Sequence, residues 1–454
     1  MGKKVYGKQE AIALLCQEFK KNNYIDPALY ERFDVKRGLR NADGTGVLAG
    51  LTLISNVHGY VVNEGEREPI EGQLIYRGYD IHHIVDDCLE HGRFGYEEVV
   101  YLLLFGVLPT AAEIDYFKTV LAQFRPLPDS FVEDIILKSP SKNIMNKMAA
   151  AILALYTHDD QADNNSIEQE LRKAIEIIAR MPTIMVNAYQ AKRRNYDNAS
   201  IFLHPINPGE STAESILSTL RPDRQFSREE AQLLDLCLML HAEHGGGNNS
   251  TFACRVLTSS GTDAYSAYAA GIGSLKGPRH GGANIKVMQM LACMKDGIRD
   301  WDDEEEVAAF LRKIVRKEAG DGSGLIYGMG HAVYTKSDPR AVILKKNAMK
   351  LAVGTEYEPE FKLLMLVEKL APAAFAEVKK DSKVMCANVD LYSGLVYKML
   401  GIPEDLFTPL FAVARIAGWS AHRMEEILTG GRIIRPGYKQ VTKEKPFVTL
   451  ADRT

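Results

Sequence analysis

Apolar residues recur at the spacing of an α-helix through most long segments of this 454-residue chain. The segment 227–245, SREEAQLLDLCLMLHAEHG, shows the pattern in full. It begins with a capping box from Ser227 to Glu230, keeps its apolar residues on one stripe and stops at Gly245. Comparable signals recur at 165–180, 303–318, 338–354, 360–378 and 408–428. The sequence therefore predicts a mainly α-helical fold.

Strand-like alternation is confined to about residues 47–76, where glycines and polar turns separate short β-branched runs. We expect a small β element there, near the N-terminus. The first 45 residues carry helical patterns instead. No repeat and no low-complexity tract marks a domain boundary, so composition alone does not divide the chain.

Charge and composition narrow the class of partner. The formal net charge of −4, from 55 basic and 59 acidic residues, provides no overall attraction to nucleic acid or to an anionic membrane. The longest apolar runs, such as 148–156, are far shorter than the roughly 20 residues that span a bilayer. Six scattered cysteines without a C-x-x-C pair fit a reducing compartment, and no signal peptide is visible. We expect a soluble cytoplasmic protein with small-molecule substrates.

Two histidines three residues apart, His241 and His244, end the 228–244 helix ahead of three glycines. A last-turn histidine commonly bonds free carbonyl groups, which is the structural interpretation. A zinc site would need a third ligand, and the H-E-x-x-H pattern is absent. The glycines also lack the Lys-Ser/Thr of a phosphate-binding loop. Residues 248–251 predict a cap for the next helix.

Two further histidines follow glycine-rich turns. His280 lies after a Gly-Pro turn and is followed by two glycines before another helix begins. A neutral imidazole there could donate to a carbonyl oxygen that gains negative charge, or could be an exposed turn residue. His331 follows two glycines, and Arg340 lies in the first turn of the next helix. A cation at that helix end is disfavoured unless an anionic partner lies nearby, although a surface arginine is an equally simple interpretation.

Three charged residues in the last quarter of the chain could likewise have a structural or a functional role. Asp390 stands where a helix N-cap belongs, and a cap would lower its pKa, whereas a general base needs its pKa raised by burial. Arg415 lies in an apolar helical stretch and needs an acidic side chain or a bound carboxylate. Arg435 lies in an irregular segment near the C-terminus.

The ordered motifs LHAEHGGGNNST, KGPRHGGAN, YGMGHAVYTKSDPR, NVDLYSG, ARIAGW and RP resemble the citrate synthase family. Toward the N-terminus the resemblance also takes in GVLAGLTLISNVHG, LIYRGYDI and EEVVYLLLFGVLPT, so it covers nearly the whole chain. It implies a mainly α-helical, two-domain homodimer. The large domain would comprise residues 1–281 and 393–454, and the small domain, residues 282–392, would close over the active site.

The resemblance also implies roles for individual residues. Asp390 resembles the base that removes the methyl proton of acetyl-CoA, and His280 resembles the donor to the thioester carbonyl. His331 resembles the donor to the carbonyl of oxaloacetate. The expected ligands of oxaloacetate and citrate are His244, Arg340 and Arg415, together with Arg435 from across the dimer interface.

The expected coenzyme A contacts are partly backbone and lie at Tyr327, Gly328, Met329, Gly330 and Lys383. Thr335 stands where many family members carry an arginine, which removes one phosphate contact of the family pattern. The small β domain of the NADH-inhibited subgroup has no counterpart in the first 45 residues, which argues against control by NADH.

The implied activity is that of an acyltransferase that makes citrate from acetyl-CoA, oxaloacetate and water, without a metal or redox cofactor. The nearest alternative is 2-methylcitrate synthase, which uses propionyl-CoA with the same catalytic residues. One extra methylene is worth only about 1–3 kcal/mol of discrimination, so the motifs do not separate the two. A His-based metallohydrolase is a remote alternative.

Overall fold

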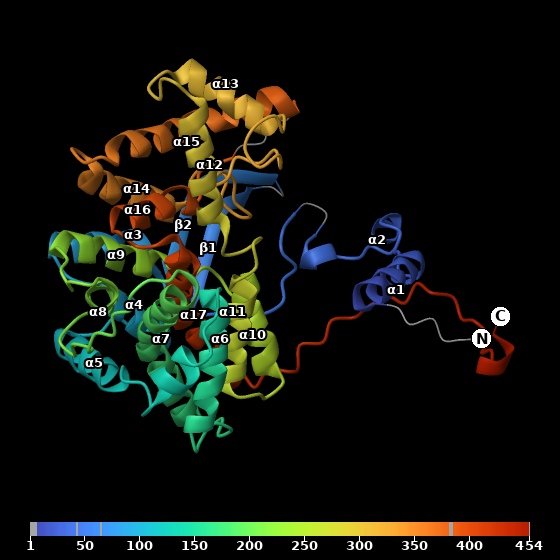
Figure 1. Ribbon diagram of the computed structural model, residues 1–454, viewed down its shortest axis with the longest axis horizontal. Helices are drawn as coiled ribbons and strands as arrows, with labels where there is room; N and C mark the ends of the chain where they lie inside the picture. The colour runs from blue at the N-terminus through green and yellow to red at the C-terminus, as the bar shows by residue number, and fades with distance from the viewer. Residues whose placement is uncertain (1–6, 42–43, 64–65, 381–384, 454) are drawn as a thin grey trace. The chain divides into compact units, whose positions relative to one another are not determined.

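The computed structural model describes residues 7–41, 44–63, 66–380 and 385–453 and confirms the mainly helical fold (Figure 1). The chain divides into two units, residues 1–51 and 52–454. The first unit contains α1 (Lys8–Asn22) and α2 (Ala28–Arg32), as the helical pattern of the N-terminal residues predicts. No helix among the described residues is long and apolar enough to cross a membrane.

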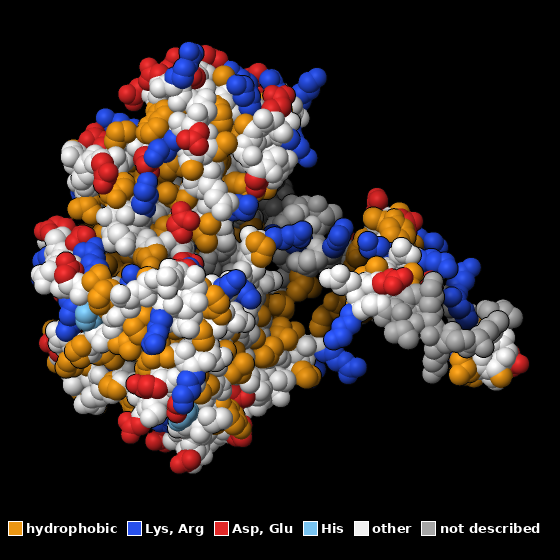
Figure 2. Space-filling model, in the orientation of Figure 1, with side chains coloured by type: hydrophobic (Ala, Val, Ile, Leu, Met, Phe, Trp, Pro, Cys, Tyr) orange, Lys and Arg blue, Asp and Glu red, His pale blue; other side chains and the backbone are white. Residues whose placement is uncertain are grey.

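The second unit contains the remaining helices. Their bounds are α3 (Ile81–Glu90), α4 (Tyr96–Phe105), α5 (Ala111–Phe124), α6 (Ile144–Leu155), α7 (Ile167–Tyr196), α8 (Thr212–Leu220), α9 (Arg228–His241), α10 (Asn249–Ser259), α11 (Ala264–Leu275), α12 (Ala283–Gly297), α13 (Glu304–Val315), α14 (Pro339–Ala352), α15 (Glu358–Lys379), α16 (Asp390–Met399) and α17 (Phe407–Leu428). On the face shown in Figure 2, basic and acidic side chains are interspersed over this unit.

The expected β element is an antiparallel sheet of β1 (Ser55–Asn63), β2 (Glu66–Tyr76) and the short β3 (Tyr79–Asp80), in that order. The strands begin later than the predicted start at residue 47. Two glycines let a loop approach the sheet closely. A Cβ at Gly59 would lie 2.7 Å from the carbonyl oxygen of Val333, and a Cβ at Gly72 would collide with that of Ser337. The sheet thus supports the 331–337 loop.

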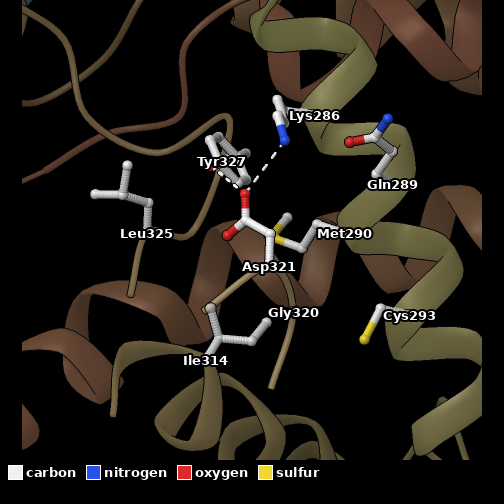
Figure 3. A pocket seen from close by; sticks show the side chains of 9 residues that line it. All are labelled: Lys286, Gln289, Met290, Cys293, Ile314, Gly320, Asp321, Leu325 and Tyr327. Atoms are coloured by element: carbon white, nitrogen blue, oxygen red, sulfur yellow. Dashed lines mark hydrogen bonds and ion pairs between the residues drawn. The ribbon is translucent and has the colours of Figure 1, made fainter. Parts of the chain in front are cut away.

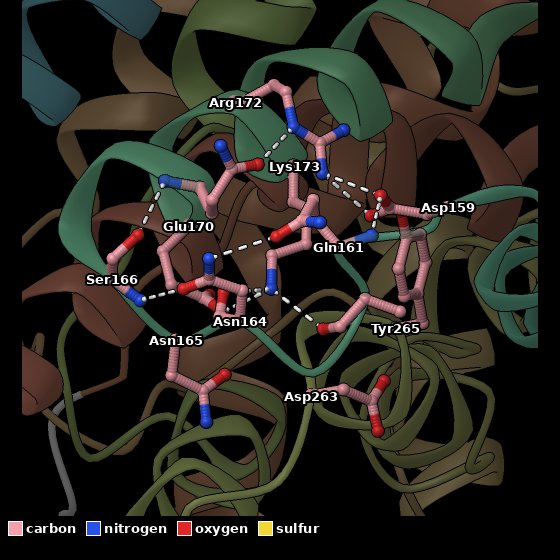
Figure 4. A network of polar contacts seen from close by, with 12 residues as sticks. Asp159, Gln161, Asn164, Asn165, Ser166, Glu170, Arg172, Lys173, Asp263 and Tyr265 are labelled. Atoms are coloured by element: carbon pink, nitrogen blue, oxygen red, sulfur yellow. Dashed lines mark hydrogen bonds and ion pairs between the residues drawn. The ribbon is translucent and has the colours of Figure 1, made fainter.

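Helix α17 forms the centre of the second unit, and all of its residues from Phe407 to Met424 are buried. It packs against α4, α7, α9 and α10. Buried charges fix it to α7, because Arg423 Nε donates to Glu170 Oε2 over 2.6 Å. Glu170 also pairs with Lys173 over 2.6 Å, and Figure 4 shows Lys173 beside Glu170 and Asn164. Lys173 Nζ donates to the carbonyl oxygens of Ala162 and Asn164. The loop before α7 is therefore held to the helix that carries Arg415.

Helices α12 to α16 pack mainly on one another. Helix α13 packs against α15, and both α12 and α14 pack against α16 (Figure 1). Helix α14 also contacts α9 and β2. The division into domains 1–281 plus 393–454 and 282–392 stays a prediction.

Candidate active site

Asp390 is the first residue of α16. The N-cap of this helix is Val389, whose side chain makes no capping hydrogen bond, so the N-cap interpretation of Asp390 is wrong by one position. The backbone N–H of Asp390 instead donates to Asn388 Oδ1 over 3.0 Å. Burial raises the pKa of Asp390 to about 6, against the lowering effect of Arg340. Its carboxyl therefore has the pKa of a base that works near neutral pH.

A short backbone pairing brings Asp390 and His331 to the same place. Met329 and Ala387 form an antiparallel bridge. On either side of it, the N–H of Gly330 donates to the Cys386 carbonyl over 2.7 Å, and the N–H of Asn388 donates to the Gly328 carbonyl over 2.9 Å. Gly328 has a φ of +81°, and a Cβ there would lie 2.8 Å from the Cα of Leu391. Only glycine allows this approach to the start of α16.

The backbone fixes which nitrogen of His331 carries the proton. His331 Nδ1 accepts hydrogen bonds from the N–H groups of Val333 and Tyr334, each over 3.0 Å. Burial, with the nearby Arg340, lowers the pKa of His331 to about 4. The ring is therefore neutral near pH 7, with its proton on Nε2. Tyr334 stacks on the ring at 4.5 Å between centroids.

His244 lies three residues beyond α9, which ends at His241 rather than at the predicted residue 244. Its ring meets the ring of His331 edge-on, at 5.1 Å between centroids. Burial and the nearby Arg340 lower the pKa of His244 well below its ordinary value. His244 Nε2 is buried and has no hydrogen-bond partner among the described residues.

Arg340 is buried in the first turn of α14, after Asp338 as N-cap and Pro339 at the first helical position. Its Nε and Nη2 donate to the two carboxylate oxygens of Asp338 over 3.0 and 2.7 Å. The anionic partner that the sequence predicted for Arg340 is thus Asp338, within the same chain. Nη1 makes no hydrogen bond to any residue that the structure describes, which leaves it available to a ligand.

Arg415 is fully buried in α17, and one side of its guanidinium lacks a partner. Its Nε donates to the His241 carbonyl over 2.6 Å, but Nη1 and Nη2 have no partner in the described part of the chain. The guanidinium lies over the ring of Phe411, 4.7 Å from its centroid. Burial lowers the pKa of Arg415 to about 10, so it remains a cation at neutral pH. Two buried donors without acceptors indicate a site for an anion.

His280 is half-buried in the turn between α11 and α12, as its flanking glycines predict. Its Nε2 lies 3.0 Å from Ser250 Oγ. Burial and the nearby Arg415 lower the pKa of His280 to about 4, so the ring is neutral. The Ser250 oxygen accepts a hydrogen bond from Trp419 Nε1 over 3.2 Å. Ser250 thus fixes the orientation of the imidazole.

His241 has the structural role that the sequence suggested. It is buried, its Nδ1 lies 2.7 Å from the carbonyl oxygen of Cys237 one turn earlier, and burial lowers its pKa to about 3. The described residues contain no group of three His, Cys, Asp or Glu side chains that could hold a metal ion. As predicted, Asn248 caps α10.

A cavity of about 180 Å³ lies beside the predicted coenzyme A segment, between α12 and the loop that leads to Tyr327 (Figure 3). The Tyr327 hydroxyl donates to Asp321 Oδ2 over 2.6 Å, and Lys286 Nζ donates to the same oxygen over 3.3 Å. Lys383, the other predicted contact, lies outside the described residues. Thr335 Oγ1 is buried without a described hydrogen-bond partner.

Arg435 is the one predicted substrate ligand that the single chain does not bring into this group. It is exposed in the irregular segment after α17 and forms no ion pair with any described residue. The structure contains one copy of the chain, so a role across an interface stays a prediction.

Sequence reasoning missed several residues that hold the site together. Ser250 stood out only as part of a helix cap, and Phe411 and Tyr334 carried no signal beyond their apolar surroundings. Glu243 lies between the two histidines of LHAEHGG, and nothing in the spacing distinguishes it from a surface residue. Its partners lie 188 residues before it and 179 residues after it in the sequence.

Comparison with known proteins gives a consistent result. Residues 42–437 match the family model described as the citrate synthase C-terminal domain. The citrate synthase of Haloferax volcanii is 36% identical over 437 residues, which cover 92% of this chain and 99% of that protein. The 2-methylcitrate synthase 2 of Corynebacterium glutamicum is 31% identical over 407 residues, which cover 89% and 94%. Relatives with both names are thus similar along nearly the whole chain.

Solved structures agree with the sequence relatives. The ternary complex of carboxymethyl coenzyme A and oxaloacetate with citrate synthase from Thermoplasma acidophilum superposes with a TM-score of 0.73 at 28% identity. The match covers 92% of this chain and 99% of that one. Citrate synthase from Pyrobaculum aerophilum matches with a TM-score of 0.72 at 29% identity, over 92% and 95% of the two chains.

Proposed function

This chain belongs to the citrate synthase family, an acyl-CoA-condensing family of transferases, and we propose that it condenses acetyl-CoA with oxaloacetate and hydrolyses citryl-CoA to citrate and CoA. The observation that carries this proposal is the pair of unpartnered, buried donors on Arg415. His244 Nε2 is a third buried group without a partner among the described residues, and the buried guanidinium of Arg340 lies nearby. Such a set fits a compact dianion, and planar guanidiniums bind carboxylates better than ammonium groups do.

Asp390 removes a proton from the methyl group of acetyl-CoA. A thioester α-proton is very weakly acidic, so the enolate oxygen must be stabilised as charge develops, and one good donor contributes about 10²- to 10³-fold. Neutral His280 supplies that donor from its Nδ1–H, with the Ser250 hydroxyl donating to its Nε2. The raised pKa of Asp390 and the lowered pKa of His280 suit this division of roles.

The enolate carbon then attacks the ketone carbon of oxaloacetate. Negative charge passes to the ketone oxygen, and His331 Nε2–H donates to it as the new carbon–carbon bond forms. Because both backbone hydrogen bonds fall on Nδ1, His331 needs no rearrangement to present this proton. Water finally cleaves the thioester and releases CoA. The reaction as proposed needs no metal or redox cofactor.

The remaining contacts are proposed from the family pattern. Tyr327, Gly328, Met329, Gly330 and Lys383 bind coenzyme A, and residues 282–392 close over the substrates and exclude water until condensation has occurred. The enzyme is a homodimer in which Arg435 reaches the carboxylate bound by the partner subunit. Exposed apolar side chains on either side of it, Ile433 and Tyr438, support packing of this segment against a second chain.

The alternative is 2-methylcitrate synthase, which the relatives with that name support. Release of free CoA thiol is measured with acetyl-CoA and with propionyl-CoA, each with and without oxaloacetate. Citrate synthase activity predicts oxaloacetate-dependent release with a higher kcat/KM for acetyl-CoA. A higher kcat/KM for propionyl-CoA would support the alternative, and release without dependence on oxaloacetate would contradict both.

A further inference from the structure

We propose that the buried pair Glu243 and His422 is a positioning pair, which fixes the loop carrying His244 against α17 so that His244 and Arg415 face one substrate carboxylate. This inference rests on the proposed function, because it concerns the same carboxylate site. Neither residue contacts the reacting atoms in the mechanism above.

Glu243 and His422 form a fully enclosed contact between the loop and the helix. Both side chains are 0% exposed, and Glu243 Oε1 lies 2.9 Å from His422 Nε2. The same oxygen accepts hydrogen bonds from Ser55 Oγ over 2.9 Å and from the N–H of Gly245 over 2.5 Å. The carboxylate of Glu243, the residue before His244, thus binds the N–H of Gly245, the residue after His244. Any shift of Glu243 would move the peptide groups on both sides of His244.

Three residues on one face of α17 hold this loop in register. Arg415 Nε donates to the His241 carbonyl, the N–H of Gly418 donates to the Ala242 carbonyl over 3.1 Å, and His422 contacts the Glu243 carboxylate. Their spacing places them along a single helix face. Because Arg415 is the first of the three, this contact also fixes the position of its free Nη atoms relative to His244.

Two glycines leave room for the contact between Glu243 and His422, one beside each side chain. A Cβ at Gly418 would collide with the carboxylate of Glu243, and a Cβ at Gly246 would lie 3.2 Å from His422 Cε1. At Gly246 the missing side chain thus leaves room for the His422 ring.

Charged side chains around Glu243 and His422 connect the pair to α10. Arg255 Nη2 lies 2.8 Å from His422 Nδ1, and the same guanidinium pairs with Glu425 and Glu426. Burial opposes the charged form of His422, but Glu243 raises its pKa above the ordinary value. Helix α10 also carries Ser250, which orients His280. One buried cluster therefore connects the supports of His244, Arg415 and His280.

Burying a carboxylate is costly unless hydrogen bonds compensate it, and removing one partner leaves an uncompensated charge. A purely structural contact between a loop and a helix could use apolar side chains at lower cost. A hydrogen-bonded carboxylate instead fixes direction and distance, which a site that binds a carboxylate with two or three donors requires.

The test compares His422→Leu with His422→Gln, because glutamine retains a donor near the position of Nε2. Oxaloacetate affinity is measured by titration calorimetry without acyl-CoA, and kcat and KM are measured for both substrates. We expect His422→Leu to weaken oxaloacetate binding and raise its KM about tenfold or more, with acetyl-CoA KM unchanged and kcat within about threefold. We expect His422→Gln to restore affinity to within about threefold of wild type.

Ser55→Ala keeps the inference testable if His422→Leu does not fold, since it removes one hydrogen bond to the same carboxylate with little loss of volume. We expect it to raise the KM for oxaloacetate about threefold. Ser420→Ala is the matched control, because Ser420 is buried on α17 and its hydroxyl donates to the Ile416 carbonyl one turn earlier in the same helix. We expect wild-type affinity from it.

Unchanged oxaloacetate affinity in His422→Leu, or in Ser55→Ala if the former does not fold, would overturn the positioning pair. Equal losses in the leucine and glutamine variants would also overturn it, because they would indicate a packing role. Failure of the proposed function is distinguishable, since the wild-type protein itself would then bind no oxaloacetate or would have a higher kcat/KM for propionyl-CoA than for acetyl-CoA.

Discussion

Arg415 and Arg423 lie about two turns apart on α17, and their guanidiniums are equally buried. The protein satisfies Arg423 with Glu170, Thr258 and the Thr262 carbonyl, whereas two nitrogens of Arg415 have no described partner. Sequence reasoning identified Arg415 as an arginine that needs an anion, from its apolar surroundings alone. It did not single out Arg423, and only the folded chain shows which arginine is already paired.

Substitutions of the two arginines are expected to change the free energy of unfolding of the ligand-free protein in opposite directions. Arg415→Met removes a buried charge whose Nη1 and Nη2 have no described partner, so we expect the free energy of unfolding to rise by about 1–3 kcal/mol while oxaloacetate binding is lost. Arg423→Met leaves Glu170 with fewer partners, so we expect a loss of about 3–5 kcal/mol. Urea unfolding and calorimetric titration measure both quantities. Equal destabilisation by the two substitutions would show that the protein itself satisfies Arg415.

The raised pKa of Asp390 predicts where the acid limb of the pH–rate profile lies. A base must be deprotonated to act, so activity is present above the pKa of Asp390, about 6, and falls as pH drops through it. His280 and His331, with pKa values of about 4, stay neutral across that limb. We expect kcat/KM to fall tenfold per pH unit below about 6. A limb centred near 4 would instead assign the titration to the histidines.

Among the helices and strands, predictions from local signals were the most accurate. The capping box at Ser227 and the Asp338-Pro339 start of α14 are both present, because caps depend on residues a few positions apart. The start of α16 was misplaced by one residue, since an acidic side chain fits either at the N-cap or just inside the helix. The burial that raises the pKa of Asp390 depends on residues distant in sequence.

The pairing of residues 328–330 with 386–388 was not predictable from local sequence, since more than fifty residues separate the two segments. It explains why Gly328 and Gly330 should respond differently to substitution. Both have positive φ, but only a Cβ at Gly328 would contact other atoms, those of Leu391.

We therefore expect Gly328→Ala to reduce kcat at least tenfold and to lower the free energy of unfolding by about 2 kcal/mol or more, because it pushes the start of α16 away. Gly330→Ala, the matched control, should cost only the backbone strain of roughly 1 kcal/mol. Steady-state kinetics and urea unfolding of both variants check this. Similar effects on kcat would mean that the bridge does not position Asp390.

At the scale of the whole molecule, the candidate site draws on segments from residue 244 to residue 415, and one predicted ligand is missing from it. Of the seven catalytic and substrate residues that the ordered motifs predicted, six lie in the second unit with perturbed pKa values, unpartnered donors or both. Arg435 is the exception, because its own side chain is exposed and forms no ion pair with a described residue, although the neighbouring Ile434 N–H donates to Ser259 Oγ.

Mixing two inactive variants tests the proposed sharing of Arg435. A heterodimer of Asp390→Asn and Arg435→Ala subunits would hold one site with both defects and one with neither. We expect verified heterodimers to recover about half of the wild-type activity per dimer. Absence of recovery would mean that Arg435 acts within its own subunit or not at all.

The most direct test of the central claim, that Asp390 is the base beside an intact dicarboxylate site, is the Asp390→Asn enzyme. Oxaloacetate affinity and condensation rate with acetyl-CoA are measured on the same preparation. The account predicts a Kd within about threefold of wild type and a kcat reduced by at least about 10³-fold, because the amide cannot accept the proton. A kcat close to that of wild type would contradict it.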